Sequence, residues 1–422
     1  MAPGNPQNVL YAMPIEQQRI IAAQQTGQMG AMPGMPNMPK GSPMVQGGPS
    51  GPSSPPSFYI PDKPVLAITR GVNTLAFTTA MGIICLNATW GEPVAILMCS
   101  SGLVGIAYKL GKKVVVFMAK KLTPEVWSVI TAASTHTDTI HFGNVGDAHR
   151  MHPAIYAQRM ATINHISQGR SFICLGYGEK MNLDPYGISW NKPLTRVVES
   201  IKVMRALWSG ESVSFDGEFY TLKDAELQIQ PEFGNGVPIY IAATGPKALR
   251  VAGEYGDGWV TNAMPSRLFR EKSLAVDEGA KNRDKSLGPI EKTLFIFISI
   301  GNDQDEAYSS IEPIKHALVW PELLSQAGYE IEIDDEYKGL EYTKIMPNDS
   351  DILRKFKEMG QKYYSREIVM DFIIAGSKQD VIEKMEEYID VGVDHFFLRD
   401  FSPDKEYSFH ILSNDILPYF RK

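Results

Sequence analysis

The chain has 422 residues, of which 44% are hydrophobic, and this length allows one large domain or two smaller ones. Its net charge of −7 argues against nucleic acid as a general partner. The three cysteines are widely spaced, and neither a CxxC pair nor a His/Cys cluster with zinc spacing is present. These features argue against a disulfide framework and against a metal site.

Charge is distributed unevenly along the chain. Residues 1–121 contain three acidic residues and nine Lys or Arg, whereas residues 122–422 contain 45 acidic residues and 32 Lys or Arg. We therefore interpret the chain as two unlike parts that meet near residues 110–122. Residues 1–57 are rich in Pro, Gly, Met, Gln and Ser and lack the pattern of a signal peptide. We expect a disordered tail there, because such a segment buries too little apolar surface to offset its ordering entropy.

Residues 58–121 form an apolar segment that has two possible structures. Residues 72–89 carry no charge, residues 94–110 carry one lysine, and five lysines lie between 109 and 121. One interpretation is a helical membrane hairpin with a basic flank, so that contact through residues 72–110 anchors a cytoplasmic catalytic domain. The other is the rebuilt start of a soluble barrel, with strands at 93–100 and 114–118 and a short helix at 102–111.

From residue 122 onward, helical and strand patterns alternate. Thr123 and Pro124 are typical of a helix start. The patterns then predict a strand at 139–142, a loop at 143–151, a helix at 153–168, a buried strand at 171–175 and a helix at 193–208. Residues 212–230 alternate like an antiparallel hairpin that turns at Asp216-Gly217.

Residues 237–262, VPIYIAATGPKALRVAGEYGDGWVTN, predict a complete βαβ unit. The first apolar run is typical of a strand buried on both faces, and Pro246 suits the first position of a helix. Because the unit is compact, we expect parallel strands and a right-handed crossover. Thr244 and the free N–H groups at the helix start are a candidate phosphate site, and an ordinary Gly-Pro turn is the alternative.

The remaining patterns predict a helix at 265–284, a strand at 293–300, a helix at 378–391 and a final strand at 395–398. Residues 303–364 are too long for a simple connection, and we interpret them as a helical insertion or lid. Strands alternating with helices over about 300 residues favour an α/β fold, the (β/α)8 TIM barrel. A Rossmann sheet is disfavoured because no GxGxxG opens a helix.

From residue 122 onward, the chain resembles the bacterial-luciferase-like oxidoreductases, and in particular their branch that uses the deazaflavin coenzyme F420. The resemblance rests on segments in family order, among them TPEVWSVITAASTHTDTIHFGN, LGYGEKMNLDPYG, RVVESIKVMRALWSGESVSFDGEFYTL and VPIYIAATGPKALRVAGEYGDGWV. It implies a TIM barrel whose site lies at the carboxyl ends of the strands. It also implies a small-molecule substrate and a homodimer.

The resemblance also implies roles for individual residues. The family's third-strand bulge, with its cis peptide against the cofactor ring, corresponds to Gly143, Asn144 and Val145. The glutamate after the fourth strand corresponds to Glu179, which could act as a general acid with a raised pKa. A solvated loop carboxylate is the alternative for this residue. Further cofactor-binding residues implied by the match are Gly178, Asn182, Thr244, Gly245 and Pro246.

Three other side chains near these segments are considered for substrate contact. His149 and Tyr177 are candidates for substrate contact, and Tyr177 could equally pack. His152 precedes a helix, and a cap or a packed ring is the better interpretation for it. One departure from the family is that Ala119-Lys120 stands where relatives carry an Asp-His pair.

Three functions follow from this reading. The first is an F420-dependent oxidoreductase that moves hydride between the deazaflavin and a C1-tetrahydropterin such as methylenetetrahydromethanopterin, a ketone or an alcohol. The second is an FMN-dependent luciferase-like monooxygenase on the same fold. The third is a membrane-tethered, non-catalytic barrel.

Overall fold

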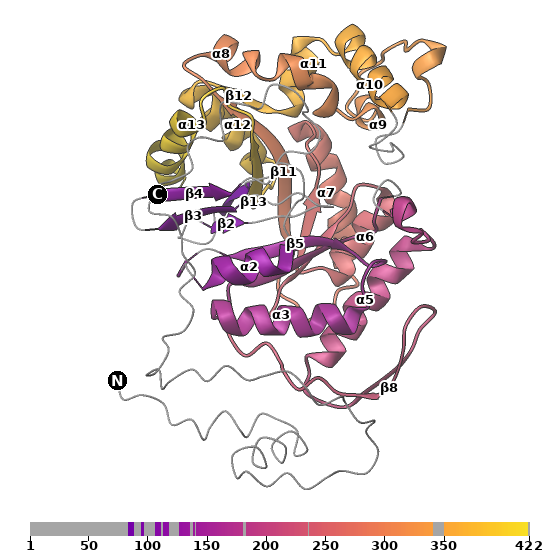
Figure 1. Cartoon of the computed structure of the whole chain (residues 1–422). Helices are drawn as coiled ribbons and strands as arrows, with labels where there is room; N and C mark the ends of the chain where they lie inside the picture. The colour runs from indigo at the N-terminus through magenta and orange to yellow at the C-terminus, as the bar shows by residue number, and fades with distance from the viewer. Residues whose placement is uncertain are drawn as a thin grey trace, which may run out of the picture. The chain divides into compact units, whose positions relative to one another are not determined.

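The fold was taken from a computed structural model, which is drawn in Figure 1. It describes residues 83–87, 94–96, 106–110, 113–117, 126–135, 138–139, 141–179, 183–234, 236–340 and 350–420. The tail predicted at residues 1–57 lies outside the described residues, as do Ala119, Lys120 and Asn182.

Six strands lie side by side in one parallel sheet. In spatial order they are β5 (Phe142–Asp147), β6 (Ser171–Gly176), β9 (Ile239–Ala242), β10 (Gly258–Thr261), β11 (Glu291–Ile300) and β13 (His395–Asp400). The short strand β12 (Ile374–Gly376) also runs parallel to the end of β11. Because spatial order follows chain order and helices connect the strands, this is the sheet of a (β/α) barrel, as predicted.

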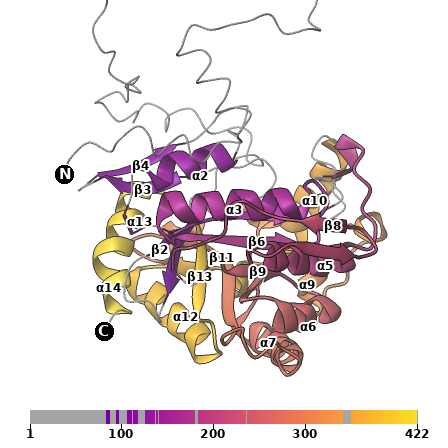
Figure 2. The ribbon, with the colours of Figure 1, turned by 90° about the horizontal axis from the view of Figure 1, so that it is seen from below.

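Helices cover the outer side of the strands. The covering helices are α2 (Val126–Ser134), α3 (Pro153–Ser167), α5 (Pro193–Leu207), α6 (Pro246–Tyr255), α7 (Ser266–Ala280), α12 (Lys378–Asp390) and α13 (Lys405–Ile411). Figure 2 shows α3, α5, α6 and α7 following one another along this side. The predicted βαβ unit at 237–262 is confirmed as β9, α6 and β10, and the hairpin is confirmed as β7 (Val213–Asp216) and β8 (Thr221–Ala225).

Side chains of the parallel strands alternate between two cores. Ile173, Ile241 and Trp259 face the helices and belong to the large core. Their strand neighbours Cys174 and Tyr240 belong to a small inner cluster, whose other buried members are Phe172, Val260 and Phe397. This alternation explains why the strands read as continuous apolar runs, since both of their faces are buried.

The described residues before α2 are strands. β1 (Ile83–Asn87) pairs antiparallel with β13, and β2 (Val94–Ile96) pairs antiparallel with β1. β3 (Ile106–Leu110) and β4 (Lys113–Phe117) form a separate antiparallel pair. The edge of β13 supplies backbone partners for β1, and an unpaired edge would leave those groups unsatisfied.

Both sequence interpretations of this stretch need correction. The helical hairpin at 72–110 is wrong at the described positions, because β1, β2 and β3 are strands. In the rival interpretation the strands agree with β2 and β4, but the helix at 102–111 is wrong, because β3 lies there. No helix among the described residues is both long and apolar enough to cross a membrane.

The segment between β11 and β12 is helical, as predicted for residues 303–364 (the insertion). It contains α8 (Gln304–Ser309), η4 (Glu312–Ala317), α9 (Pro321–Leu324), η5 (Asp335–Tyr337) and α10 (Ser350–Tyr363). α11 (Arg366–Phe372) leads from it into β12. Figure 1 shows α8, α9, α10 and α11 gathered beyond β12. Because β12 pairs with the last residues of β11, the insertion begins at the carboxyl end of the sheet.

Candidate functional site

The carboxyl ends of β5, β6 and β9 bring most of the predicted site residues to one edge. The loop after β5 begins with Ala148 and His149, the loop after β6 contains Tyr177, Gly178 and Glu179, and the turn at residues 244–246 follows β9. The three strands are neighbours and parallel, so the loops that follow them lie at the same edge of the sheet. This edge is where ligands bind in (β/α) barrels.

A hydrogen bond joins the loops after β6 and β9. The hydroxyl of Tyr177 lies 2.9 Å from Oγ1 of Thr244. The indole N–H of Trp190 donates to the backbone carbonyl of Tyr177 over 2.8 Å. Tyr177 is therefore held from both sides, which supports the packing interpretation and leaves its contact with substrate a prediction.

The 244–246 turn opens a helix whose first N–H groups have no side-chain cap. Gly245 is the N-cap residue of α6, Pro246 is its first residue, and no side chain bonds to the cap. A Cβ added at Gly245 would meet no atom within 4 Å. The start of α6 therefore has no side-chain cap and has space beside Gly245, which is compatible with a phosphate site.

The loop after β5 is fixed by Asp147, a residue that the sequence reasoning missed. Its Oδ1 accepts from the backbone N–H groups of His149 (2.9 Å) and Arg150 (3.0 Å), and its Oδ2 pairs with Arg150 Nε at 2.8 Å. The hydroxyls of Tyr156 and Tyr220 donate to the backbone carbonyls of Asp147 and Ala148. The signal that could have found it is the spacing of Asp, His and Arg in GDAHR, which is typical of an Asx turn.

Glu179 lies beside this ion pair. Burial raises the pKa of its carboxyl group, the Arg150 guanidinium opposes that shift, and the Asp147 carboxylate reinforces it. Glu179 therefore carries its proton at a higher pH than an ordinary glutamate does. A raised pKa is what a general acid needs, and the role of Glu179 as that acid stays a prediction.

Gly178 allows the loop after β6 to approach His149. Gly178 has φ +77°, and a Cβ added there would lie 3.0 Å from Leu183 Cδ1 and 3.3 Å from His149 Nδ1. The His149 side chain is 1% exposed, and neither ring nitrogen meets a hydrogen-bond partner of good geometry in the described chain. Burial lowers the pKa of His149, and the Asp147 carboxylate opposes that shift.

His152 has the structural role expected of it. Its side chain accepts from the N–H of Ala154 as the N-cap of α3, and its ring meets Tyr220 edge-on.

The predicted bulge at residues 143–145 is a regular strand. Asn144 and Val145 pair in register with Ile173 and Cys174, so the loop expected from residue 143 begins only after β5. No peptide bond among the described residues is cis, which corrects the expectation at Asn144–Val145. The regular parallel pairing with β6 accounts for the difference.

These strand residues face opposite sides of the sheet. Val145 packs on the inner cluster. Asn144 is 6% exposed. A Cβ added at Gly146 would lie 3.3 Å from the side-chain nitrogen of Asn144 and would also meet the hydroxyl of Tyr156, so the Asn144 side chain lies on the side of Tyr156. A Cβ at Gly143 would lie 2.2 Å from the ring of Phe172, so this glycine is required for packing. The side chain of Asn144 is therefore buried, and the cofactor contacts predicted for Gly143, Asn144 and Val145 stay predictions.

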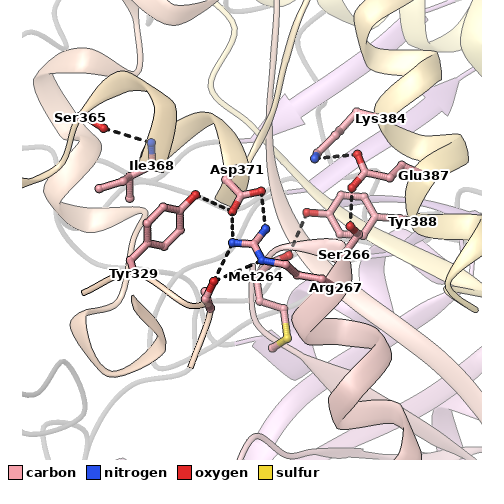
Figure 3. Close-up of polar contacts among 11 residues, drawn as sticks. Met264, Ser266, Arg267, Tyr329, Ser365, Ile368, Asp371, Lys384, Glu387 and Tyr388 are labelled. Atoms are coloured by element: carbon pink, nitrogen blue, oxygen red, sulfur yellow. Dashed lines mark hydrogen bonds and ion pairs between the residues drawn. The ribbon is translucent and has the colours of Figure 1, made fainter. Parts of the chain in front are cut away.

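Two cations on α7 were not predicted. Lys272 Nζ donates to the backbone carbonyl of Thr244 (3.0 Å) and to Gln326 Oε1 (2.8 Å). Arg267 donates to the carbonyl of Ala327. It also pairs with Asp371, as Figure 3 shows. The available signal was helical spacing, which puts Lys272 on the buried stripe of α7.

A cavity of about 680 Å³ lies at the opposite, amino-terminal end of the strands. Lys292 at the start of β11 and Asp394 before β13 line it, with the end of α7. It holds none of the predicted site residues. No cluster of three or more metal-ligating side chains occurs among the described residues.

Comparison with known proteins identifies the relatives of this chain. The sequence model of the luciferase-like monooxygenase family matches residues 106–395. The 5,10-methylenetetrahydromethanopterin reductase of Archaeoglobus fulgidus is 29% identical over 298 residues, covering 69% of this chain and 87% of that protein. The F420-dependent glucose-6-phosphate dehydrogenase of Mycobacterium avium is 29% identical over 302 residues, covering 69% and 82%.

Two solved structures are also similar. An F420-dependent secondary alcohol dehydrogenase, in complex with an F420–acetone adduct, superposes with a TM-score of 0.57 at 25% identity, covering 71% of this chain and 86% of that one. The coenzyme F420-dependent tetrahydromethanopterin reductase of Methanopyrus kandleri superposes with a TM-score of 0.59 at 24% identity, covering 70% and 88%. The second similarity concerns the fold alone.

Proposed function

Because the chain belongs to the luciferase-like monooxygenase family, we propose that it is an F420-dependent oxidoreductase that acts on a small organic molecule. The relatives named above are F420-dependent dehydrogenases and a methylenetetrahydromethanopterin reductase. Candidate substrates are therefore a C1-tetrahydropterin, a ketone or an alcohol. The predicted homodimer and cytoplasmic location stay predictions.

The observation that carries the proposal is the position of Glu179 at the same sheet edge as the 244–246 turn. The loops that contain them are joined by the bond between Tyr177 and Thr244. A phosphate-bearing flavin needs one site for its phosphate and a separate site for its ring, both at the carboxyl edge of the sheet. The free N–H groups of α6 suit the first, and the carboxyl of Glu179, whose pKa is raised, suits the second.

The chain's own groups then have distinct roles. When bound, the deazaflavin supplies hydride transfer at its ring. The backbone at Gly245 would hold the phosphate, and the backbone of residues 143–145 would contact the ring. Glu179 donates a proton to the substrate oxygen or nitrogen in one direction and accepts it in the other.

The second candidate is an FMN-dependent monooxygenase. It is favoured by the name of the matching family and by the 244–246 turn, which suits the phosphate of FMN as well as that of F420. The two cofactors differ in chemistry, because reduced FMN reacts with O₂ and the deazaflavin does not.

A binding titration distinguishes these candidates. The full-length protein is titrated with F420 and, separately, with FMN, and each cofactor's fluorescence is followed. We expect saturable, stoichiometric binding of F420, followed by turnover of reduced F420 with one of the candidate substrates. Binding of FMN with consumption of O₂ would support the monooxygenase, and binding of neither cofactor would refute both.

A further inference from the structure

Lys272 is a buried cation at the junction of two segments. Its side chain comes from α7, and the residue is 9% exposed. Its two hydrogen-bond acceptors, the Thr244 carbonyl and the Gln326 amide, are both neutral. No carboxylate of the described residues lies within 4.0 Å of its ammonium group, and burial lowers the pKa of Lys272 against the opposing charge of Glu271. A buried cation without a counter-ion is costly, so a specific role is expected of it.

The bond to Thr244 fixes the orientation of the 244–246 turn. The carbonyl of Thr244 and the N–H of Gly245 belong to the same peptide group. In a trans peptide these two groups point in opposite directions. By holding the carbonyl at 3.0 Å, Lys272 directs the N–H of Gly245 away from itself and strengthens it as a donor by polarising the peptide.

The bond to Gln326 ties the same ammonium to the insertion. Residues 326–329 are also fastened by Arg267, which donates to the carbonyl of Ala327 at 2.7 Å and 3.2 Å. Arg267 pairs with Asp371, and Asp371 accepts a hydrogen bond of 2.8 Å from the hydroxyl of Tyr329, as Figure 3 shows. Two cations of α7 therefore hold one short segment of the insertion.

We propose that Lys272 is a positioning residue that couples phosphate binding at the 244–246 turn to docking of residues 326–329. The proposal rests on the proposed function, since it requires a phosphate-bearing cofactor at the turn. A phosphate there stabilises the orientation of the turn that Lys272 holds, and with it the bond to Gln326. By linkage, docking of the insertion strengthens phosphate binding to the same extent.

The test compares two ligands that share the deazaflavin and its ribityl chain. F420 continues into a phosphodiester and a carboxylate-bearing tail, whereas FO ends at the ribityl chain. In the full-length Lys272→Met variant we expect F420 affinity to fall about tenfold and FO affinity to change less than about twofold. Lys272→Arg should recover part of the loss. Lys281→Met is the matched control, because Lys281 is an exposed residue at the end of the same helix.

A second measurement uses the wild-type protein and does not depend on the folding of a variant. Lys338 is exposed within the insertion, so trypsin cleavage after it reports on docking. We expect F420 to slow this cleavage and FO to leave it unchanged. In Gln326→Leu, F420 should bind within about threefold of wild type but should no longer protect Lys338.

The outcomes separate this inference from the proposed function. If wild type binds F420 but Lys272→Met loses F420 and FO equally, Lys272 has only a structural role and the coupling is refuted. Equal protection by F420 and FO refutes it as well. If wild type binds FMN instead, FMN replaces F420 and riboflavin replaces FO in both measurements, and the expected differences are the same. Binding of no phosphate-bearing flavin refutes both proposals together.

Discussion

The hydroxyl of Tyr177 lies 2.9 Å from Oγ1 of Thr244, which joins the loops after β6 and β9. The first loop carries Glu179, and the second precedes the free N–H groups of α6. The bond therefore sets the spacing between the candidate acid and the candidate phosphate site. A hydrogen bond of this kind contributes about 1 kcal/mol, which corresponds to about fivefold in affinity.

We expect Tyr177→Phe and Thr244→Val each to weaken F420 binding about fivefold, because each removes the same bond. The double variant should bind F420 about as tightly as the weaker-binding of the two single variants. Fluorescence titration measures all four affinities, and Tyr186→Phe, at a side chain that is 77% exposed, is the control. Additive losses in the double variant would mean that the two side chains act separately.

Glu179→Gln should bind F420 as wild type does but turn over 10²- to 10⁴-fold more slowly, roughly the range attributed to a general acid. The pKa of Glu179 is raised by burial, so the protonated form persists to a higher pH than usual. If the acid form is required, the rate is constant below that pKa and falls as pH rises through it. The kcat profile of wild type and of Glu226→Gln, an exposed control, should show this fall.

How much the sequence predicted depends on whether the signal was local. The unit β9–α6–β10 was predicted closely, because an apolar run, a Gly-Pro break and a helical stripe each occur within a few residues. The end of β5 was missed, because Gly143 and Gly146 indicate a loop locally. Pairing with β6 and contact with Phe172 override that signal.

The same distinction between local and distant signals applies to the residues of the candidate site. Tyr177, Glu179 and Thr244 follow strands, and parallel pairing is enough to bring strand ends together. Lys272 and Asp147 depend on contacts between distant elements, which periodicity does not contain. Lys272 in particular bonds to a carbonyl 28 residues away and to a side chain 54 residues away.

Asp371→Ala should destabilise the protein by about 1–2 kcal/mol, because it leaves the hydroxyl of Tyr329 and one side of Arg267 without their partner. Urea unfolding measures the change in the free energy of unfolding. Asp351→Ala is the matched control, since its ion pair with Arg354 is exposed on α10 and should contribute little. Equal losses in the two variants would contradict the importance assigned to the Asp371 network.

Stability should fall as pH falls from 6.5 toward 4. Burial lowers the pKa values of His141 and His316 to about 4, against an ordinary 6.5. In this window the unfolded chain binds protons that the folded chain does not, so the histidine contribution is present above pH 6.5 and is lost on acidification. Each proton that only the unfolded chain binds lowers the free energy of unfolding by about 1.4 kcal/mol for each pH unit of acidification.

Urea unfolding between pH 7 and pH 4.5 measures this dependence. The double variant His141→Gln/His316→Gln should show a shallower loss of stability than wild type. His410→Gln, at an exposed histidine, should keep the wild-type slope. A double variant with an unchanged slope would assign acid sensitivity to other groups, among them His149 and the carboxylates.

Truncation tests whether the N-terminal strands belong to the barrel. A division of the chain falls between Lys63 and Pro64, after the tail predicted at residues 1–57, so residues 64–422 should unfold at the temperature of the full chain and bind F420 equally well. Residues 119–422 lack β1, whose five residues pair with β13 from His395 to Arg399. Loss of β1 exposes that edge, and we expect melting at least about 10 °C lower, or aggregation. If residues 119–422 melted and bound F420 like the full chain, β1 would be dispensable and the barrel would be complete without it.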